Sequence, residues 1–91
     1  MKKYNFSKII KTADNSESLK LSIALRNILG VSNKIENPLK AYGWYSTLEN
    51  SDELMLDDSD KKLLYNFIET NDNVYLFVKG AILEALNNGT D

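Results

Sequence analysis

The hydrophobic pattern of the last third of the chain predicts a helix that is apolar on two sides. In residues 73–86, NVYLFVKGAILEAL, Lys79 and Glu84 are the only charged residues. One apolar row follows the 3.6-residue period of a helix, and a second row runs beside it. Such a helix is typical of the middle of a bundle, so we expect other helices to pack around it. In that arrangement Gly80 would allow a close helix crossing.

An alternative is that three other short helices leave part of this apolar surface uncovered. A chain of 91 residues buries only roughly 60–65% of its unfolded surface, which limits how well a long apolar helix can be covered. An uncovered row would be available to a protein partner or to a second copy of the chain. We expect this row to consist of Tyr75, Leu76, Leu83 and Leu86.

Upstream, residues 18–30 and the segment from Asn37 predict two further helices. Apolar residues recur at positions 21, 24, 25 and 28, which is the spacing of one helix face. Serines precede this run as candidate N-caps, and Gly30 stands where a left-handed C-cap residue belongs. Asn37 and Pro38 predict the start of the next helix, because Asn accepts hydrogen bonds from free helix amides and Pro fits the first helical position.

Two stretches have the alternating pattern of extended chain. Tyr4 and Phe6 alternate with polar residues in the N-terminal arm, and a turn-rich patch, TADNSES, follows. Leu54 and Leu56 alternate with their neighbours within residues 53–57. These two stretches could therefore pair as a minor β structure.

Together the patterns predict a mostly α fold that forms a single domain over residues 1–91. Residues 1–17 would be a short strand or extended arm with its loop, and residues 18–88 a small bundle of about four short helices. Short polar side chains are the candidate N-caps of the last two helices: Asp58 or Ser59, and Asn71 or Asp72.

The amino-acid composition limits the chemistry of the protein. The chain has neither Cys nor His, which removes disulfides, the usual zinc sites and imidazole acid–base catalysis. We therefore expect no cofactor and no enzymatic activity. No apolar stretch reaches the about 20 residues that a membrane-spanning helix needs, and the N-terminal lysines are not followed by a secretion-signal core.

Charge is divided unequally between the two halves of this acidic protein, whose pI is about 5.1. Residues 1–40 hold eight Lys or Arg against three acids, and residues 41–91 hold three against ten. The favoured interpretation is that the halves fold against each other and mix their charges over one surface. The alternative is a dipolar particle whose acidic face meets a basic partner or stacks head to tail with another copy.

The acidic residues between positions 52 and 60 are the main carboxylate cluster of the sequence. They lack the sharp-turn Gly and the final Glu of a calcium loop, so a metal site is not favoured. Carboxylates at a helix start cap free amides and complement the helix dipole, which is the simplest role here. An acidic recognition patch of Asp57, Asp58 and Asp60 is the alternative.

Nucleic-acid binding is weakly supported. Lys2, Lys3, Lys8 and Lys11 could contact phosphate, but a low pI and a single Arg argue against a dedicated nucleic-acid-binding protein.

The second half of the chain carries a pattern of apolar, acidic and glycine positions. Its members are Tyr42, Leu48, Asp52, Glu53, Leu54, Leu56, Leu64, Ile68 and Gly80. In this pattern residues 40–86 resemble a group of small proteins encoded by tailed bacteriophages and prophages. The resemblance implies a phage-type protein acting in the cytoplasm of a bacterial host.

The function expected from these observations is that of a non-enzymatic phage-type accessory protein that binds another protein, for example to modulate or inhibit a host or defence component. A self-associating structural or assembly component of a phage is one alternative, and a weak nucleic-acid-binding accessory protein is another. The candidate partner-binding residues are Asp57, Asp58, Asp60, Tyr75, Leu76, Leu83 and Leu86.

Overall fold

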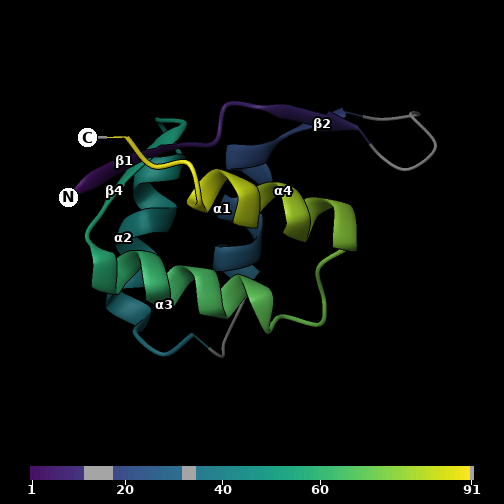
Figure 1. Ribbon diagram of the computed structural model, residues 1–91. Helices are drawn as coiled ribbons and strands as arrows, with labels where there is room; N and C mark the ends of the chain where they lie inside the picture. Colours follow the sequence, from purple (N-terminus) through teal and green to yellow (C-terminus); the bar gives the residue numbers. More distant parts are fainter. Residues whose placement is uncertain (12–17, 32–34, 91) are drawn as a thin grey trace.

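The computed structural model describes residues 1–11, 18–31 and 35–90, and within these ranges it contains four helices and two small antiparallel sheets (Figure 1). The strands are β1 (Lys2–Asn5), β2 (Ile9–Lys11), β3 (Ser18–Lys20) and β4 (Glu53–Leu56). The helices are α1 (Leu21–Val31), α2 (Pro38–Leu48), α3 (Asp58–Glu69) and α4 (Leu76–Leu86). The predicted set of four short helices is therefore present, combined with more β structure than a purely helical bundle has.

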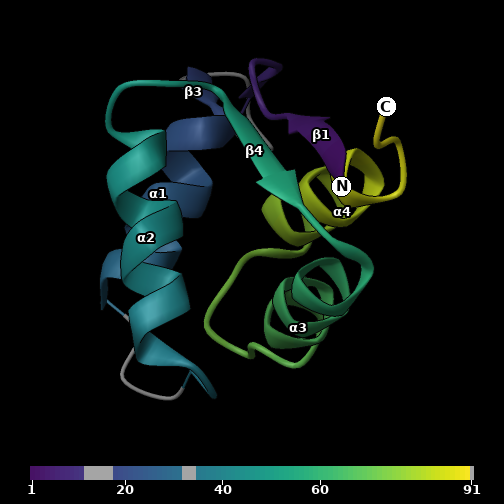
Figure 2. The ribbon, with the colours of Figure 1, turned by 90° about the vertical axis from the view of Figure 1, so that its left-hand side faces the viewer.

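The helices form two pairs, α1 with α2 and α3 with α4, and β4 crosses from one pair to the other (Figure 2). Contacts between α1 and α4 join the pairs. One continuous apolar core fills the space where they meet. Its helical side chains with at most 1% exposure are Leu21, Leu25, Leu64, Ile68, Ile82 and Leu86.

The pairing of β1 with β4 confirms the prediction made from the alternating patterns. The strands are antiparallel, and Tyr4 lies opposite Leu54. Both side chains are buried, as are Phe6 and Leu56. Because successive side chains of a strand point to opposite faces, these residues form one apolar face against the helices.

The second hairpin, formed by β2 and β3, was not expected from the sequence. Residues 18–20 were predicted as the start of a helix, but they form a strand and α1 begins only at Leu21. The amide of Leu21 donates to the Lys8 carbonyl and the amide of Ser22 to the Phe6 carbonyl, both at 2.8 Å. Backbone acceptors thus satisfy the first two amides of the helix, in place of a serine side chain. Most of the predicted loop TADNSES, residues 12–17, lies outside the described residues.

The N-termini of α2 and α3 are capped by side chains. The Asn37 side chain accepts a hydrogen bond from the Lys40 amide at 3.2 Å, as the Asn-Pro signal predicted. In α3 the cap is Asp57, one position before the two candidates considered from the sequence. Its carboxylate accepts from the Asp60 amide at 2.7 Å.

The predicted cap of α4 is wrong, because this helix begins later than expected. Its first residue is Leu76, and the N-cap position is held by Tyr75, which makes no side-chain cap hydrogen bond. The Asn71 side chain instead accepts from the Asn73 amide at 2.9 Å within the preceding loop. Neither Asn71 nor Asp72 is close enough along the chain to reach the first turn of α4 as a cap.

Two glycines have roles that differ from those expected. Gly30 lies inside α1 rather than at its C-cap, and an added Cβ there would be 2.8 Å from the Tyr45 ring. This glycine therefore permits the close contact between α1 and α2. Gly80, predicted to admit a close crossing, is exposed and has no atom within 4 Å of the Cβ position.

We expect Gly80→Ala to increase the free energy of unfolding by about 0.5–1 kcal/mol, because Ala in an open helical position restricts the unfolded chain and fills no occupied space. Gly30→Ala should give no such gain, because its methyl group meets the Tyr45 ring. Urea denaturation of the two variants beside the wild type measures the difference. An equal gain in both variants would contradict the close α1–α2 contact.

Candidate functional site

Only part of the apolar surface of α4 is buried. Val78, Ile82 and Leu86 follow each other at a four-residue spacing and form the buried side, while the helix packs against α3, α1 and β1. The predicted position in the middle of a bundle is therefore wrong: α4 lies at the edge of the molecule, beneath the β1–β2 segment (Figure 1). The start of the helix is where apolar surface stays exposed.

The predicted uncovered row is correct at one end of the helix and wrong at the other. Tyr75 is 78% exposed and Leu76 is 83% exposed, whereas Leu83 is half-buried. Leu86 is in the core at 1% exposure, because it lies one turn after Ile82 on the buried side of the helix. Phe77, the next residue after Leu76, is also exposed, at 39%.

Tyr75, Leu76 and Phe77 together form what we term the apolar patch. The rings of Tyr75 and Phe77 are stacked, with centroids 6.0 Å apart and planes inclined by 12°. Aromatic pairing of this kind restrains both side chains. The patch therefore presents two mutually supported rings and a projecting Leu to the solvent.

The backbone beside the apolar patch is also incompletely satisfied. The first hydrogen bond of α4 runs from the Lys79 amide to the Tyr75 carbonyl at 2.9 Å. No side chain caps the amides that precede it in the helix. An uncapped helix start leaves these donors to water or to a bound partner.

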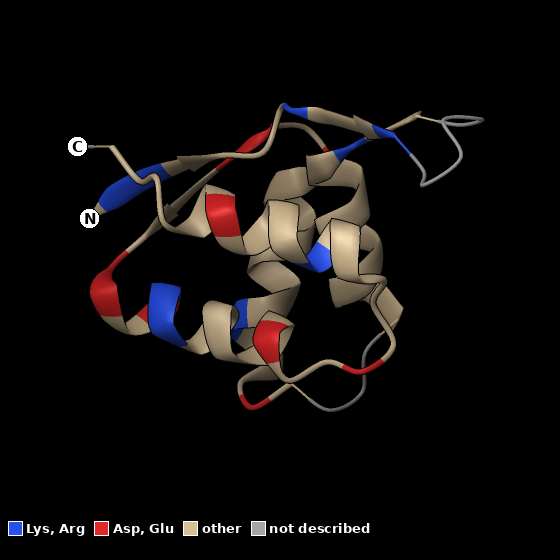
Figure 3. Ribbon diagram, turned by 45° about the vertical axis from the view of Figure 1, so that its right-hand side comes forward, with Lys and Arg blue, Asp and Glu red and all other residues tan. Residues whose placement is uncertain are grey.

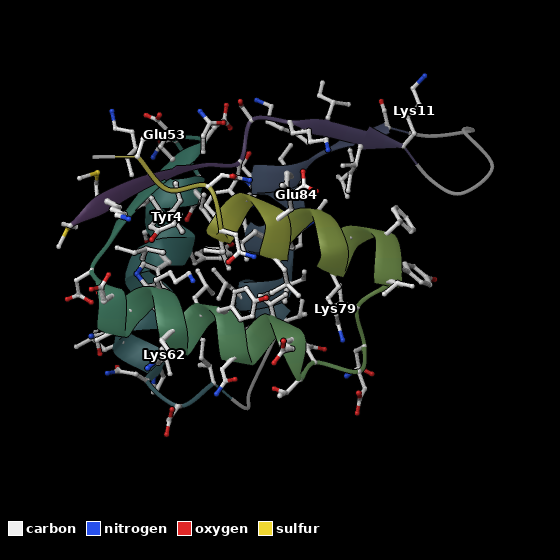
Figure 4. The ribbon with its side chains drawn as sticks, viewed as in Figure 1. Tyr4, Lys11, Glu53, Lys62, Lys79 and Glu84 are labelled. Atoms are coloured by element: carbon white, nitrogen blue, oxygen red, sulfur yellow. The ribbon has the colours of Figure 1, made fainter. Side chains whose placement is uncertain are left out.

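The segment that leads into the patch carries acidic side chains. Glu69, the last residue of α3, and Asp72, in the following loop, are both exposed. Lys79, in the first half of α4, reaches back toward the end of α3, and its Nζ donates to the Glu69 backbone carbonyl at 3.2 Å (Figure 4). With two carboxylates against one ammonium group, this segment keeps a small excess of negative charge.

The three predicted acidic residues of α3 have largely structural contacts. Asp57 caps the helix, and the Asp60 carboxylate forms an ion pair with the Lys40 ammonium of α2. This hydrogen-bonded carboxylate raises the pKa of Lys40. Asp58 is exposed in the first turn, where its charge complements the helix dipole. The group thus stabilises α3 and its contact with α2, and Asp58 is the member best placed to meet a partner.

Basic and acidic residues are mixed over the face shown in Figure 3. Blue segments of β1, β2 and α3 lie among red segments of the same face. Among the described residues, three ion pairs join the basic first half to the acidic second half. The Lys8 ammonium is 4.0 Å from the Glu84 carboxylate, and the Lys20 ammonium is 3.4 Å from that of Asp52. The third is the Lys40–Asp60 pair. This distribution agrees with charges that mix rather than separate into two poles.

Asp52 makes a polar junction that sequence reasoning did not identify. The buried Ser22 hydroxyl donates to its carboxylate at 2.7 Å, and the Lys20 ammonium donates at 3.4 Å. The Ser22 hydrogen bond, assisted by the charge of Lys20, lowers the pKa of Asp52 below its ordinary value. The arrangement holds the start of α1 against the segment that leads into β4.

No family model matches this chain, and no curated protein or solved structure is significantly similar to it. Within residues 1–11, 18–31 and 35–90, no group of three or more acidic side chains is arranged to hold a metal ion. In the same ranges, every helix is too short or too polar to cross a lipid bilayer. The apolar patch is the surface feature with the clearest capacity for binding.

The lowered pKa of Asp52 predicts a specific loss of stability in acid. Because the folded-state pKa lies below the unfolded value, the contribution of Asp52 is complete above the ordinary carboxyl range near pH 4 and disappears as the pH falls through the folded pKa. Asp52→Asn should be less stable than the wild type at neutral pH, and the difference should shrink below pH 4. Thermal unfolding of both proteins across this range tests the prediction, and a constant difference at every pH would contradict it.

Proposed function

We propose that this protein is a non-enzymatic binding module that docks onto another protein through its apolar patch. The exposure of Tyr75, Leu76 and Phe77 at the uncapped start of α4 is the observation that supports this proposal. Aromatic side chains are enriched among the residues that dominate binding energy at protein interfaces. A chain without Cys or His also lacks the side chains of the commonest catalytic centres.

The resemblance of residues 40–86 to small phage and prophage proteins supplies the biological setting of the proposal. In this setting the protein acts in a bacterial host cell as an accessory protein, and its target is a host or defence component that it modulates or inhibits. Binding to a preformed surface of such a component requires no cofactor and no reaction.

The chemistry of the patch specifies the kind of surface that it fits. Leu76 is exposed beside a stacked pair of aromatic rings, so it suits an apolar pocket on the partner. Glu69 and Asp72 are exposed in the segment that leads into the patch, so the pocket should be bordered by Lys or Arg. The partner is therefore a protein with an apolar pocket and a basic rim.

We expect Leu76→Asp to abolish the recovery of a partner from a bacterial lysate treated with nuclease. A central interface side chain contributes about 2 kcal/mol, which is roughly thirtyfold in Kd, and a buried carboxylate costs more. Leu39→Asp is the matched control, because Leu39 is 80% exposed on α2, outside the patch. Both variants should keep the helical circular dichroism of the wild type.

Three results decide the interpretation of this capture experiment. A protein recovered by the wild type and by Leu39→Asp, but lost with Leu76→Asp, supports docking through the patch. A protein that all three recover would contradict the use of the patch, and Asp58→Lys then tests the acidic surface of α3. If only the bait is recovered, light scattering measures whether the protein associates with itself. A strict monomer would contradict the alternative of a self-associating structural or assembly component.

The nucleic-acid alternative has less support from the structure. Lys8 and Lys20 lie close to Glu84 and Asp52, which reduces the positive charge left to contact phosphate. Figure 4 shows Glu84 on the side of α4 that faces the β2 segment. A weak affinity that falls steeply with salt is the result that would support this alternative over protein binding.

A further inference from the structure

The residues after α4, numbers 87–90, run back along the N-terminal strand and are here termed the C-terminal strap. Thr90 and Lys3 exchange two backbone hydrogen bonds: the Lys3 amide donates at 2.7 Å and the Thr90 amide at 2.9 Å. The strap thereby covers part of the outer edge of β1, and the two ends of the chain lie side by side (Figure 1). Exposed strand edges pair readily with other strands, so this cover is protective.

Asn88 fixes the beginning of the strap to the end of α4. Its side-chain Nδ2 donates to the Glu84 carbonyl at 2.8 Å, and its backbone amide donates to the Ala85 carbonyl at 3.2 Å. The side-chain amide is thus a second donor to this carbonyl of the last helical turn, which also accepts from the Asn87 amide at 3.1 Å. This bond requires a donor, which an amide supplies and a carboxylate does not.

The residue after Asn88 must be glycine, because the buried Tyr4 ring lies against it. A Cβ at Gly89 would lie 2.6 Å from Cε1 of that ring and 2.7 Å from its Cζ. Tyr4 is only 4% exposed, so the ring has little room to withdraw. Figure 4 shows Tyr4 beside the C-terminal segment. Packing therefore requires the glycine of this Asn-Gly dipeptide, whose asparagine is exposed.

An Asn-Gly sequence is chemically labile, because glycine offers no side chain to hinder attack by its amide nitrogen on the preceding side chain. Asn88 is the only asparagine of the chain that is followed by glycine. It is exposed and lies beyond the last residue of α4, where its backbone amide donates to the Ala85 carbonyl. Among the described backbone hydrogen bonds outside the helices and strands, none uses the Gly89 amide as donor.

We propose that Asn88 is a site of spontaneous deamidation and that this modification releases the C-terminal strap from β1. The Gly89 nitrogen gives up its proton to solvent base and forms a bond to Cγ of Asn88, and the side-chain nitrogen leaves as ammonia. Water then opens the resulting succinimide at either carbonyl. The product is Asp or isoaspartate at position 88, and the net change is the exchange of an amide for a carboxylate by hydrolysis.

The product no longer fits the place that Asn88 occupies. A carboxylate beside the Glu84 carbonyl has no proton to donate, and its negative charge is unfavourable at the C-terminal end of a helix. The isoaspartate product also adds a carbon atom to the backbone, which moves Thr90 out of register with Lys3. Release of the strap leaves the Lys3 amide and carbonyl without their partners and uncovers the outer edge of β1.

The test is to incubate the full chain at neutral and mildly alkaline pH and to follow the peptide of residues 80–91 by mass spectrometry. Asn50, which precedes Ser51, is an internal comparator on another exposed segment. We expect conversion at position 88 to be several-fold faster than at Asn50 and to accelerate with pH, because the attacking nitrogen must lose its proton. Equal rates at the two positions would overturn the proposed site.

Two variants separate the modification from its structural effect. Asn88→Gln keeps the side-chain donor but forms a six-membered ring only slowly, so it should resist conversion. Asn88→Asp reproduces one product directly, and hydrogen exchange followed by NMR measures its effect on the strap. The amides of Lys3 and Thr90 should lose protection several-fold, while the protection of the Ile82 amide should be unchanged. Full protection of Lys3 and Thr90 in Asn88→Asp would overturn release of the strap.

Discussion

The hydrogen-bonded junction of Phe6, Ser22 and Asp52 is the interaction on which the rest of the structure depends. Ser22 donates two hydrogen bonds: its amide to the Phe6 carbonyl and its hydroxyl to the Asp52 carboxylate. The Phe6 amide in turn donates to the Asp52 carbonyl at 2.7 Å. Three segments distant in sequence are thus joined at the start of α1. Ser22 is 1% exposed, so each lost partner would leave a buried polar group at a cost of about 1–3 kcal/mol.

This junction explains how one N-terminal segment contributes to two sheets. The chain pairs with β4 before Phe6 and with β3 after Lys8, and between these strands it supplies the carbonyls that satisfy the start of α1. Phe6 itself is fully buried beneath the crossing. The N-terminal arm is therefore an integral part of the core: it links the α1–α2 pair to β4 and, through β1, to α4.

The features that could be predicted from the sequence are those set by neighbouring residues. The start of α2 at Asn37-Pro38 and the alternating strand around Leu54 have their causes within a few positions. The start of α1 could not be predicted, because its amides are satisfied by carbonyls about fifteen residues earlier in the chain. The role of Gly30 depends in the same way on a Tyr45 ring from another helix, and periodicity carries no information about such contacts.

The candidate site was predictable in kind but not in position. Excess apolar surface on α4 follows from composition and chain length, but the side that stays exposed depends on which row meets α1 and α3. Those helices bury Val78, Ile82 and Leu86, so the exposed surface is confined to the uncapped first turn. Binding and stability are thus separated along one helix: Ile82 and Leu86 anchor its later turns in the core, while Leu76 contributes little to that core. A short chain can therefore keep exposed apolar residues without losing its fold. The first turn of α4 exposes apolar side chains to water, which is unfavourable, but it contributes little to the packing of the core.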